Sequence, residues 1–397
     1  MGDASEPKVV SRGLLSGPAP VVAVVVAAAV AGGLSPGFTD LYVYLQAGRS
    51  VLDGLPVEHP VDPVTGLSFT YPPFAALVMV PLALVPGCLA AAFVTGASVA
   101  ALAATVRVVR IALARPAPGW LVALVTVGAL ALEPVWQNLT FGQVNLVLML
   151  AVVLDLLRPD RRWCGVLIGI AAAVKLTPLV FVLLLLLVGR RTAAGRAVLV
   201  FAGSVAIGFA LMPGWAASYW SHGLFDARRV GPPGLAHNQS IYGVLTRLLD
   251  GPPPTLLWLA VAAPLAAAIL VLGAWWWRHG DRVLGTCLGA VAMLLASPVS
   301  WSHHWVWAAP IALLLWERAR WACVLWGVVF VARPIVWPPY GRGREAAWSP
   351  LEHVAGNAYV LAALALCIWA ARRATSGPAL RGLGARGRTP GADPLAS

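Results

Sequence analysis

The sequence is poor in charged residues and contains only two lysines. Of its 397 residues, 11% are charged and 59% are hydrophobic, and the mean hydropathy is +0.80. In soluble domains about a quarter of all residues are charged. This shortage of charge excludes an ordinary globular protein and indicates a protein that crosses a membrane several times.

Motifs of several enzyme and transporter classes are also missing. There is no P-loop, no glycine-rich dinucleotide motif after a strand and no pair of carboxylates within one motif. The five cysteines stand singly in apolar segments without a CxxC spacing, so they predict neither disulfide bonds nor a metal site. These absences argue against ATP-driven transport and against soluble nucleotide-sugar chemistry, and we expect neither a metal nor a cofactor.

Basic residues cluster in the short breaks between apolar runs. Arginines gather near positions 107–115, 158–162, 190–196, 278–282 and 318–320, and both ends of the chain are basic. Loops rich in lysine and arginine stay in the cytoplasm. We therefore place both termini there, and membrane orientation rather than nucleic-acid binding accounts for the net charge of +12.

The apolar runs predict an all-α, polytopic membrane protein with about 12 transmembrane segments, some short or broken, and interfacial helices in the first outer loop. The expected segments are 17–34, 73–106, 120–133, 144–157, 164–174, 177–188, 197–212, 255–277, 283–296, 304–316, 321–337 and 354–371. The expected outer loops are 35–72, 134–143, 175–177, 213–254, 297–303 and 338–353. Segment 73–106 is too long for one straight span and should be kinked at Pro86-Gly87.

Three domains are expected: a cytoplasmic arm (1–16), a transmembrane catalytic domain (17–371) and a disordered basic cytoplasmic tail (372–397). Polar apices at 133–145, 175–178 and 297–305 interrupt pairs of short apolar segments. Non-helical polar backbone at membrane depth is tolerated only where it lines a cavity or is buried in protein. These apices predict one outward-facing cavity that is cut into the bilayer.

Asp40 directly follows the first apolar segment, within the sequence Phe38-Thr39-Asp40-Leu41-Tyr42-Val43-Tyr44. A carboxylate at the membrane boundary is costly to place and usually marks a functional site. The stretch around it, with Tyr44, fits a helix that lies along the outer interface. A helix-capping carboxylate is the structural alternative for Asp40.

Lys175 and the pair His303-His304 are the cationic candidates at the other apices. Lys175 lies at an apex rather than at an arginine-flanked end, where it suits a phosphate or carboxylate. Adjacent histidines are poorly placed to share a metal, so one of them is expected to bind phosphate or orient a carboxylate while the other packs. Which of the two is functional stays open.

Further polar candidates lie in the outer loops. Asn238 and Ser240, with Arg247 behind them, suit sugar hydroxyls or a phosphate, but they equally fit loop and cap residues. Glu133 precedes a proline and could be structural or contact substrate.

The order of these motifs resembles glycosyltransferase family 87. The resemblance rests on Asp40-Leu41-Tyr42-Val43-Tyr44, Phe69-Thr70-Tyr71-Pro72-Pro73, Gly142-Gln143-Val144-Asn145, Lys175-Leu176-Thr177-Pro178, Asn238-Gln239-Ser240 and 297–304, and it covers about residues 15–371. It implies a GT-C-fold membrane enzyme with a lipid-linked sugar donor and an extracytoplasmic active site in the cell membrane. The family is typified by actinobacterial polyprenol-phosphate-mannose-dependent α-1,2-mannosyltransferases.

The resemblance implies that Asp40 is the catalytic base. We expect Lys175 and His304, with His303 and Arg247 behind them, to bind the donor phosphate. Substrate-binding candidates are Tyr44, Tyr71, Glu133, Gln143, Asn145, Asn238 and Ser240. The expected reaction is inverting transfer of mannose from polyprenyl phosphate mannose to a glycolipid or lipoglycan. Another polyprenyl-linked sugar, such as arabinofuranose or glucose, and a lipid or sugar transporter remain alternatives, and the motifs do not fix the acceptor.

Overall fold

The computed structural model describes residues 17–376 without 36, 58–65, 159–161 and 225–226, and the regular elements among these residues are helices. The α-helices are α1 (Ala19–Leu34), α2 (Thr39–Leu52), α3 (Pro73–Ala83), α4 (Gly87–Ala112), α5 (Gly119–Ala129), α6 (Glu133–Phe141), α7 (Asn145–Leu157), α8 (Val166–Val174), α9 (Val180–Leu187), α10 (Arg191–Leu211), α11 (Pro213–Ser218), α12 (Ile241–Leu248), α13 (Thr255–Arg278), α14 (Arg282–Ala296), α15 (Ala308–Arg318), α16 (Arg320–Ala332), α17 (Pro350–Gly356) and α18 (Ala358–Thr375). Short 3-10 turns include η2 (Thr177–Leu179), η4 (Ala227–Val230), η5 (Ser302–Trp307), η6 (Pro334–Val336) and η7 (Arg344–Ala347), and a π-helical turn, η3, spans Tyr219–Gly223. The all-α prediction is confirmed.

Several helices are long and apolar enough to cross a membrane. Among the described residues these are α4, α10, α13 and α18; two bent pairs, α1 with α2 and α5 with α6, also qualify when each is taken as one span. Shorter apolar helices account for much of the remaining chain. The expected count of about 12 crossings therefore stays a prediction, while the membrane class is supported.

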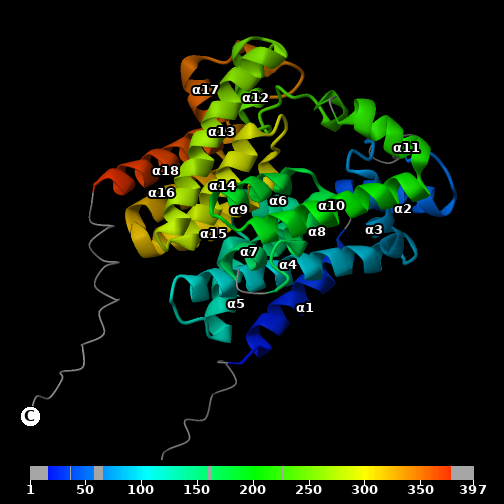
Figure 1. The fold of residues 1–397 in the computed structure, drawn as a ribbon, viewed down its shortest axis with the longest axis horizontal. Coiled ribbons are helices and arrows are strands. Elements are labelled where there is room, and N and C mark those ends of the chain that lie inside the picture. The colour runs from blue at the N-terminus through cyan, green and yellow to red at the C-terminus, as the bar shows by residue number, and fades with distance from the viewer. Residues whose placement is uncertain (1–16, 36, 58–65, 159–161, 225–226, 377–397) are drawn as a thin grey trace, which may run out of the picture.

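Lipid contact also explains the surface of the long helices. Leu199 and Leu211 on α10 are 73% and 63% exposed, and comparable apolar side chains cover α1, α13 and α16. Such extensive apolar exposure is unfavourable in water but is expected for side chains that face lipid tails. The core lies inward, where α14 is buried along nearly its whole length between α13, α9 and α7 (Figure 1).

The breaks between helices follow from proline and glycine. Segment 73–106 consists of two helices, α3 and α4, because Pro86 ends the first run and precedes Gly87. The region 134–143, predicted as a loop, contains α6, which starts at Glu133-Pro134 and ends at Gly142 in the left-handed conformation. That prediction was wrong, because a proline at the first turn and a glycine after the last turn favour a short helix.

The expected domain limits are only partly within the described residues. The arm 1–16 and residues 377–397 of the tail lie outside them. Helix α18 continues to Thr375, four residues beyond the limit at 371 that the sequence predicted. Arg372 and Arg373 thus lie in its last turn, where cations favour the negative end of the helix dipole.

Helix α2 leaves the direction of α1 by 77° and carries Asp40 in its first turn. Its buried side includes Tyr44 and Leu45, whereas Tyr42 is exposed. An amphipathic helix that turns away from a spanning segment is typical of the membrane interface. The position of α2 along the membrane interface stays a prediction.

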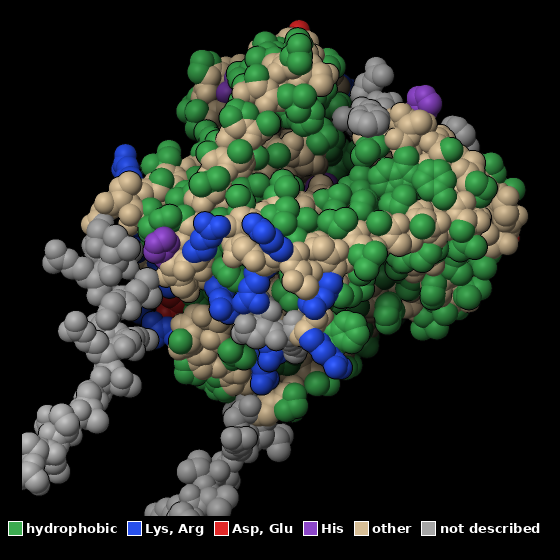
Figure 2. Space-filling view, in the orientation of Figure 1, with side chains coloured by type: hydrophobic (Ala, Val, Ile, Leu, Met, Phe, Trp, Pro, Cys, Tyr) green, Lys and Arg blue, Asp and Glu red, His purple; other side chains and the backbone are tan. Residues whose placement is uncertain are grey.

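Charge is distributed unevenly over the surface. Figure 2 shows Lys and Arg side chains gathered on one part of the visible face, towards the start of α1, with hydrophobic side chains over the lobe of α12 and α13. The same view shows a recess between that lobe and the lobe of α10 and α11. Positive charge on one side of the helices is the pattern expected for the cytoplasmic face.

Cysteine labelling tests this orientation. In a Cys88→Ser background, which removes the exposed native thiol, Leu55→Cys should react with an impermeant maleimide on intact cells. Thr192→Cys should react only after the membrane is opened, because we expect the start of α10 to be cytoplasmic. Both positions are exposed. The opposite labelling pattern would mean that the topology is inverted.

Candidate active site

Asp40 is joined to the α6–α7 turn by a short hydrogen bond. The amide Nε2 of Gln143 donates to Oδ2 of Asp40 at 2.6 Å. Asp40 does not cap α2, because the N-cap position is Phe38 and the hydrogen bond of Asp40 reaches a residue 103 positions away. A charge-assisted bond of this length stabilises the carboxylate form of Asp40.

Two tyrosines hold the other end of the Gln143 side chain. The hydroxyl of Tyr44 donates to Oε1 of Gln143 at 2.8 Å, and the hydroxyl of Tyr71 lies 3.0 Å from the same oxygen. The two hydroxyls are 2.8 Å apart, and the rings meet edge to face. Gln143 is therefore fixed between Asp40 on one side and a tyrosine pair on the other.

Asn145 continues the network from Gln143 to Lys175. Its Nδ2 donates to Oδ1 of Asn138 at 3.1 Å and to the backbone carbonyl of His303 at 3.2 Å, while its Oδ1 accepts from Nζ of Lys175 at 2.9 Å. A chain of side chains thus runs from the carboxylate of Asp40 to the ammonium of Lys175. The two charges lie in one site without forming a direct ion pair.

His304, rather than His303, contacts the lysine. Nε2 of His304 lies 2.9 Å from Nζ of Lys175, and the histidine also bonds the backbone of Val299. The His303 ring is buried and packs edge to face on Phe141, with centroids 5.3 Å apart. Since an ammonium can only donate, His304 acts as the acceptor in this pair.

Lys175 sits at a break in the helical backbone. It ends α8 in an extended conformation, and the 3-10 turn η2, which contains Pro178, then starts at Thr177. Nζ donates to Asn145 and His304 and lies 5.4 Å from the centre of the Tyr71 ring. Its third N–H has no hydrogen-bond acceptor among the described residues, so it is available to an anionic ligand.

Gly142 sets the distance between α2 and the α6–α7 turn. Its φ of +70° favours glycine, and a Cβ at this position would lie 2.7 Å from Cβ of Leu41 and 3.1 Å from the Phe38 ring. A side chain here would push α2 away from Gln143. The absence of a side chain at Gly142 therefore brings Asp40 within hydrogen-bonding reach.

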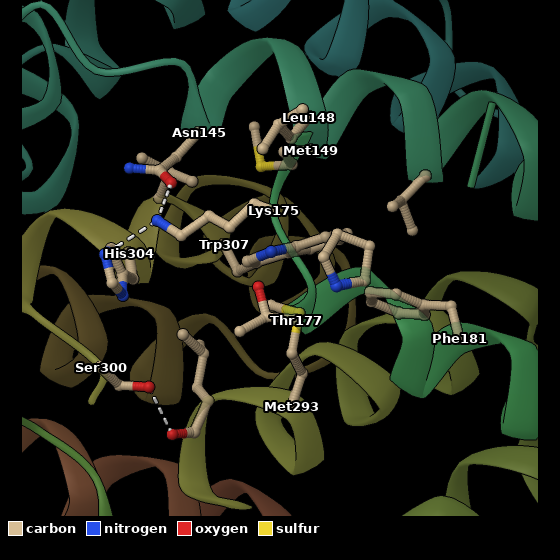
Figure 3. A pocket seen from close by; sticks show the side chains of 14 residues that line it. Asn145, Leu148, Met149, Lys175, Thr177, Phe181, Met293, Ser300, His304 and Trp307 are labelled. Carbon is tan, nitrogen blue, oxygen red and sulfur yellow. Dashed lines mark hydrogen bonds between the residues drawn. The ribbon is translucent and has the colours of Figure 1, made fainter. Parts of the chain in front are cut away.

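A narrow cleft of about 30 Å³ opens beside Lys175. Figure 3 shows Lys175 pointing towards Asn145 and His304 at one end, with Phe181, Met293 and Trp307 along the wall. Thr177 and Ser300 are the other polar side chains that line it. The wall of the cleft is mainly apolar, and Lys175 and His304 lie at its rim. This arrangement suits a lipid with an anionic head group.

Burial separates the site residues into two groups. Asp40, Tyr71, Lys175 and His304 are half-buried and can meet a ligand, whereas the side chains of Tyr44, Gln143 and Asn145 are buried. The accessible groups are a carboxylate, a phenol, an ammonium and an imidazole. The buried groups link them to one another.

Burial also moves the pKa values of the two charged groups towards each other. Desolvation raises the pKa of Asp40, against the opposing effects of the Gln143 hydrogen bond and the Lys175 charge. Desolvation lowers the pKa of Lys175 to about 7, and the charge of Asp40 opposes this shift. Both groups therefore have pKa values displaced towards neutral pH, as is common for groups that exchange protons or stabilise transient charge.

Asn238 and Ser240 form a second network, away from Asp40. Nδ2 of Asn238 donates to the carbonyls of Pro233 and Pro298, and Oδ1 accepts from the Ser300 N–H. The Ser240 hydroxyl donates to Pro298 O and accepts the N–H of Gly243, which caps α12. These contacts attach the loop before α12 to the 297–301 apex that precedes His304.

Arg247 supports the same loop from inside. It is 2% exposed and donates to Oδ1 of Asn357 and to the carbonyls of Gly234, Leu235 and Asn238. Glu133 is likewise buried and accepts a hydrogen bond from Tyr359 at 3.0 Å. The structure thus places Arg247 and Glu133 in contacts between helices rather than beside the Asp40–Lys175 chain.

Arg247→Lys should lower the thermal unfolding midpoint in detergent while leaving the donor KM of the folded fraction unchanged. A lysine ammonium cannot bond all the acceptors that the forked guanidinium of Arg247 reaches. Each buried acceptor that is left unpaired costs about 1–3 kcal/mol. Thermal unfolding and steady-state kinetics on the same preparation check this. A large rise in donor KM at unchanged stability would instead support the predicted role of Arg247 in binding the donor phosphate.

The sequence did not single out all the residues that build the site. Asn138, which orients Asn145 and donates to the backbone carbonyl of Gln143, is fully buried. Its place in the Glu133–Asn145 apex was the available signal. Phe181 and Trp307, whose ring centroids lie 5.5 Å apart, are indistinguishable from ordinary apolar residues in sequence.

The fold is that of a helical membrane protein in which a chain of hydrogen bonds joins a carboxylate to a lysine. The sequence profile of glycosyltransferase family 87 matches residues 69–298. The chain belongs to this family and is a glycosyltransferase, which confirms the resemblance noted in its motifs.

Curated relatives match most of the chain. A Mycobacterium tuberculosis protein named polyprenol-phosphate-mannose-dependent α-(1-2)-phosphatidylinositol mannoside mannosyltransferase is 34% identical over 87% of each chain. A protein of the same species named polyprenol-phosphate-mannose-dependent α-(1-2)-phosphatidylinositol pentamannoside mannosyltransferase is 34% identical over 84% of this chain and 81% of its own. A Mycolicibacterium smegmatis phosphatidylinositol mannoside mannosyltransferase is 33% identical over 85% of this chain and 84% of its own.

One solved structure is distantly similar. It is ArnT from Cupriavidus metallidurans bound to undecaprenyl phosphate, at 17% identity and a TM-score of 0.38, covering 94% of this chain and 80% of that one. Within the described part of the chain, no three His, Cys, Asp or Glu side chains gather as a metal site would require.

Proposed function

We propose that the protein transfers mannose from polyprenyl phosphate mannose to a glycolipid of the phosphatidylinositol mannoside or lipomannan type, with inversion, on the extracytoplasmic face of the cell membrane. The observation that carries the proposal is the hydrogen-bonded chain that joins the carboxylate of Asp40 to the ammonium of Lys175. The names of the mycobacterial relatives support the sugar and the acceptor class.

The reaction requires two opposite charges at separate positions. The acceptor hydroxyl oxygen attacks the anomeric carbon, the bond from that carbon to the phosphate oxygen breaks, and its electron pair remains on the polyprenyl phosphate. Asp40 takes the hydroxyl proton as general base. Lys175, through its third N–H, stabilises the charge that grows on the departing phosphate.

We place the phosphate of such a donor at the mouth of the cleft beside Lys175. The wall of this cleft is apolar, with Leu148, Met149 and Phe181 among the lining residues, and its rim carries Lys175 and His304. The lipid next to the phosphate would contact the apolar wall while the phosphate reaches the lysine. Placing the acceptor near Asp40 then brings the hydroxyl and the anomeric carbon together, which supplies orientation.

Reconstitution tests the function directly. Purified protein in liposomes should convert radiolabelled polyprenyl phosphate mannose and a phosphatidylinositol mannoside into a longer product, and NMR of that product should show an α-1,2 linkage. Parallel reactions with polyprenyl-linked arabinofuranose and glucose test the other sugars. If no donor yields product while labelled lipid or sugar crosses the bilayer, the transport alternative replaces the enzyme.

A further inference from the structure

We propose that Gln143 is a positioning residue that orients Asp40 and keeps it ionised, and that Tyr44 and Tyr71 act on Asp40 through Gln143. This inference rests on the proposed role of Asp40 as base. It gives Gln143 a task different from the substrate contact that the sequence predicted, and it makes the tyrosine pair part of the control of the base.

The burial of Gln143 separates it from the substrate. Gln143 is 4% exposed, and Tyr44, which bonds it, is 0% exposed. Both ends of its side-chain amide are bonded within the protein: Nε2 donates to Asp40, and Oε1 accepts from Tyr44, Tyr71 and Asn145. A group so enclosed acts on the reaction through Asp40, the half-buried member of the network.

The surrounding donors fix which end of the Gln143 amide faces Asp40. The side-chain oxygen of Gln143 has the two tyrosine hydroxyls at 2.8 and 3.0 Å and the Nδ2 group of Asn145 at 3.4 Å. A flipped amide would place its oxygen 2.6 Å from a carboxylate oxygen and its NH2 against the NH2 of Asn145. Both contacts would be repulsive, so the amide hydrogens point at Asp40.

This orientation favours one protonation state of Asp40. A donated N–H stabilises the carboxylate, whereas the protonated acid gains little from a second donor. Burial alone has the opposite effect and raises the pKa of Asp40. The Gln143 amide therefore offsets part of the cost of a buried negative charge, so that the base is ionised before the acceptor hydroxyl binds.

Few other ionisable groups face Asp40. Lys175 acts on it from the α8–η2 break, Tyr44 lies on α2 itself, and Tyr71 lies on the loop before α3. Helix α3 has no ionisable side chain, and Glu133, the only one on α6, bonds Tyr359. Because Lys175 also titrates, the effect of Gln143 must be read on the acid limb of the rate profile, where the lysine stays charged.

The effect of Gln143 on the pKa of Asp40 can be measured in the profile of kcat/KM against pH. Its acid limb is the part in which kcat/KM falls as the pH is lowered. Gln143→Met removes the donor, so the pKa of Asp40 should rise and the acid limb should move to higher pH by about one unit. Gln143→Glu keeps the size of the side chain but places a second carboxylate beside Asp40. The pair should then share a proton, which moves the limb further in the same direction.

Double variants test whether the tyrosines act through Gln143. Tyr44→Phe and Tyr71→Phe should each shift the acid limb upward by less than Gln143→Met does, because the amide loses one anchoring hydroxyl. Added to Gln143→Met, neither should shift it further. Additive shifts would show that the tyrosines act on Asp40 or the substrate independently, and would contradict an action through Gln143.

A second buried glutamine provides the matched control. Gln239 is 0% exposed and donates to the carbonyls of Ala236 and Gly356, outside the Asp40 network. Gln239→Met should lower the yield of folded protein but leave the acid limb of the remaining enzyme in place. If Gln143→Met and Gln143→Glu also leave the limb in place, Gln143 has no such role.

The outcome separates this inference from the proposed function. Loss of transfer in Asp40→Asn together with an unmoved acid limb in both Gln143 variants would remove the inference and keep the base. Normal transfer in Asp40→Asn would remove the base itself. An acid limb that moves to higher pH in the Gln143 variants, together with an inactive Asp40→Asn, supports both the role of Gln143 and the role of Asp40 as base.

Discussion

Asp40→Asn should lower kcat for transfer by about 10²–10⁴-fold, the range that general acid–base catalysis typically supplies. The amide keeps the size of the side chain and can still accept the hydrogen bond from Gln143, but it cannot take a proton from the acceptor hydroxyl. Membrane accumulation and the thermal unfolding midpoint should therefore stay close to those of the wild type. Initial rates with saturating donor and acceptor measure the effect.

Asp53→Asn is the matched control for this experiment. Asp53 lies directly after the end of the same helix α2 but is exposed, and its removal should leave kcat unchanged. Activity of Asp40→Asn comparable to that of Asp53→Asn would show that Asp40 serves the structure of α2 rather than the reaction.

Lys175→Ala should lower kcat by about 10²–10³-fold, as the loss of one preorganised donor to a developing oxyanion does in other enzymes. The donor KM should change less, because the charge on the phosphate grows in the transition state. Steady-state kinetics over a range of donor concentrations separate the two constants. If kcat is unchanged, or if the variant merely fails to accumulate, Lys175 is a structural anchor and His304 becomes the leading phosphate ligand.

The pH dependence gives a second test of Lys175. Because its pKa is lowered to about 7, the ammonium form predominates below pH 7 and is lost as the pH rises through this value. The wild-type kcat/KM should therefore fall on the alkaline side with an apparent pKa near 7. In Lys175→Arg, which stays charged, this fall should disappear although the overall rate recovers only in part. A fall that persists in Lys175→Arg belongs to another group.

The membrane class and the helical architecture could be predicted from composition, because 59% hydrophobic residues and few charges leave no soluble alternative. The turns were harder. Region 134–143 was expected as a loop, yet it contains α6, since a polar sequence on a short helix is compatible with burial when each side chain finds a partner. Asn138 illustrates this, being polar, fully buried and bonded to Gln143 and Asn145.

The sequence identified chemical types but could not tell which groups meet. Asp40, Gln143, Asn145, Lys175 and His304 lie in one hydrogen-bonded chain, whereas Asn238, Ser240 and Arg247 hold a loop in place. Both groups contain amides, hydroxyls and cations near an apex, so composition and spacing describe them equally well. Only tertiary contacts across more than a hundred residues, such as that between Asp40 and Gln143, distinguish them.

The long separation between these partners has a consequence for biosynthesis. Asp40 meets Gln143 only after a further 103 residues have been made, and Lys175 meets His304 only after the 129 residues that follow Lys175 have been made. The ribosome adds about 5–20 residues each second, so the early helices are made many seconds before the last part of the site. A nascent chain that ends before η5 contains Asp40 and Lys175 but lacks His304. Under the proposed mechanism, the emerging polypeptide should therefore gain activity only after η5 has been made.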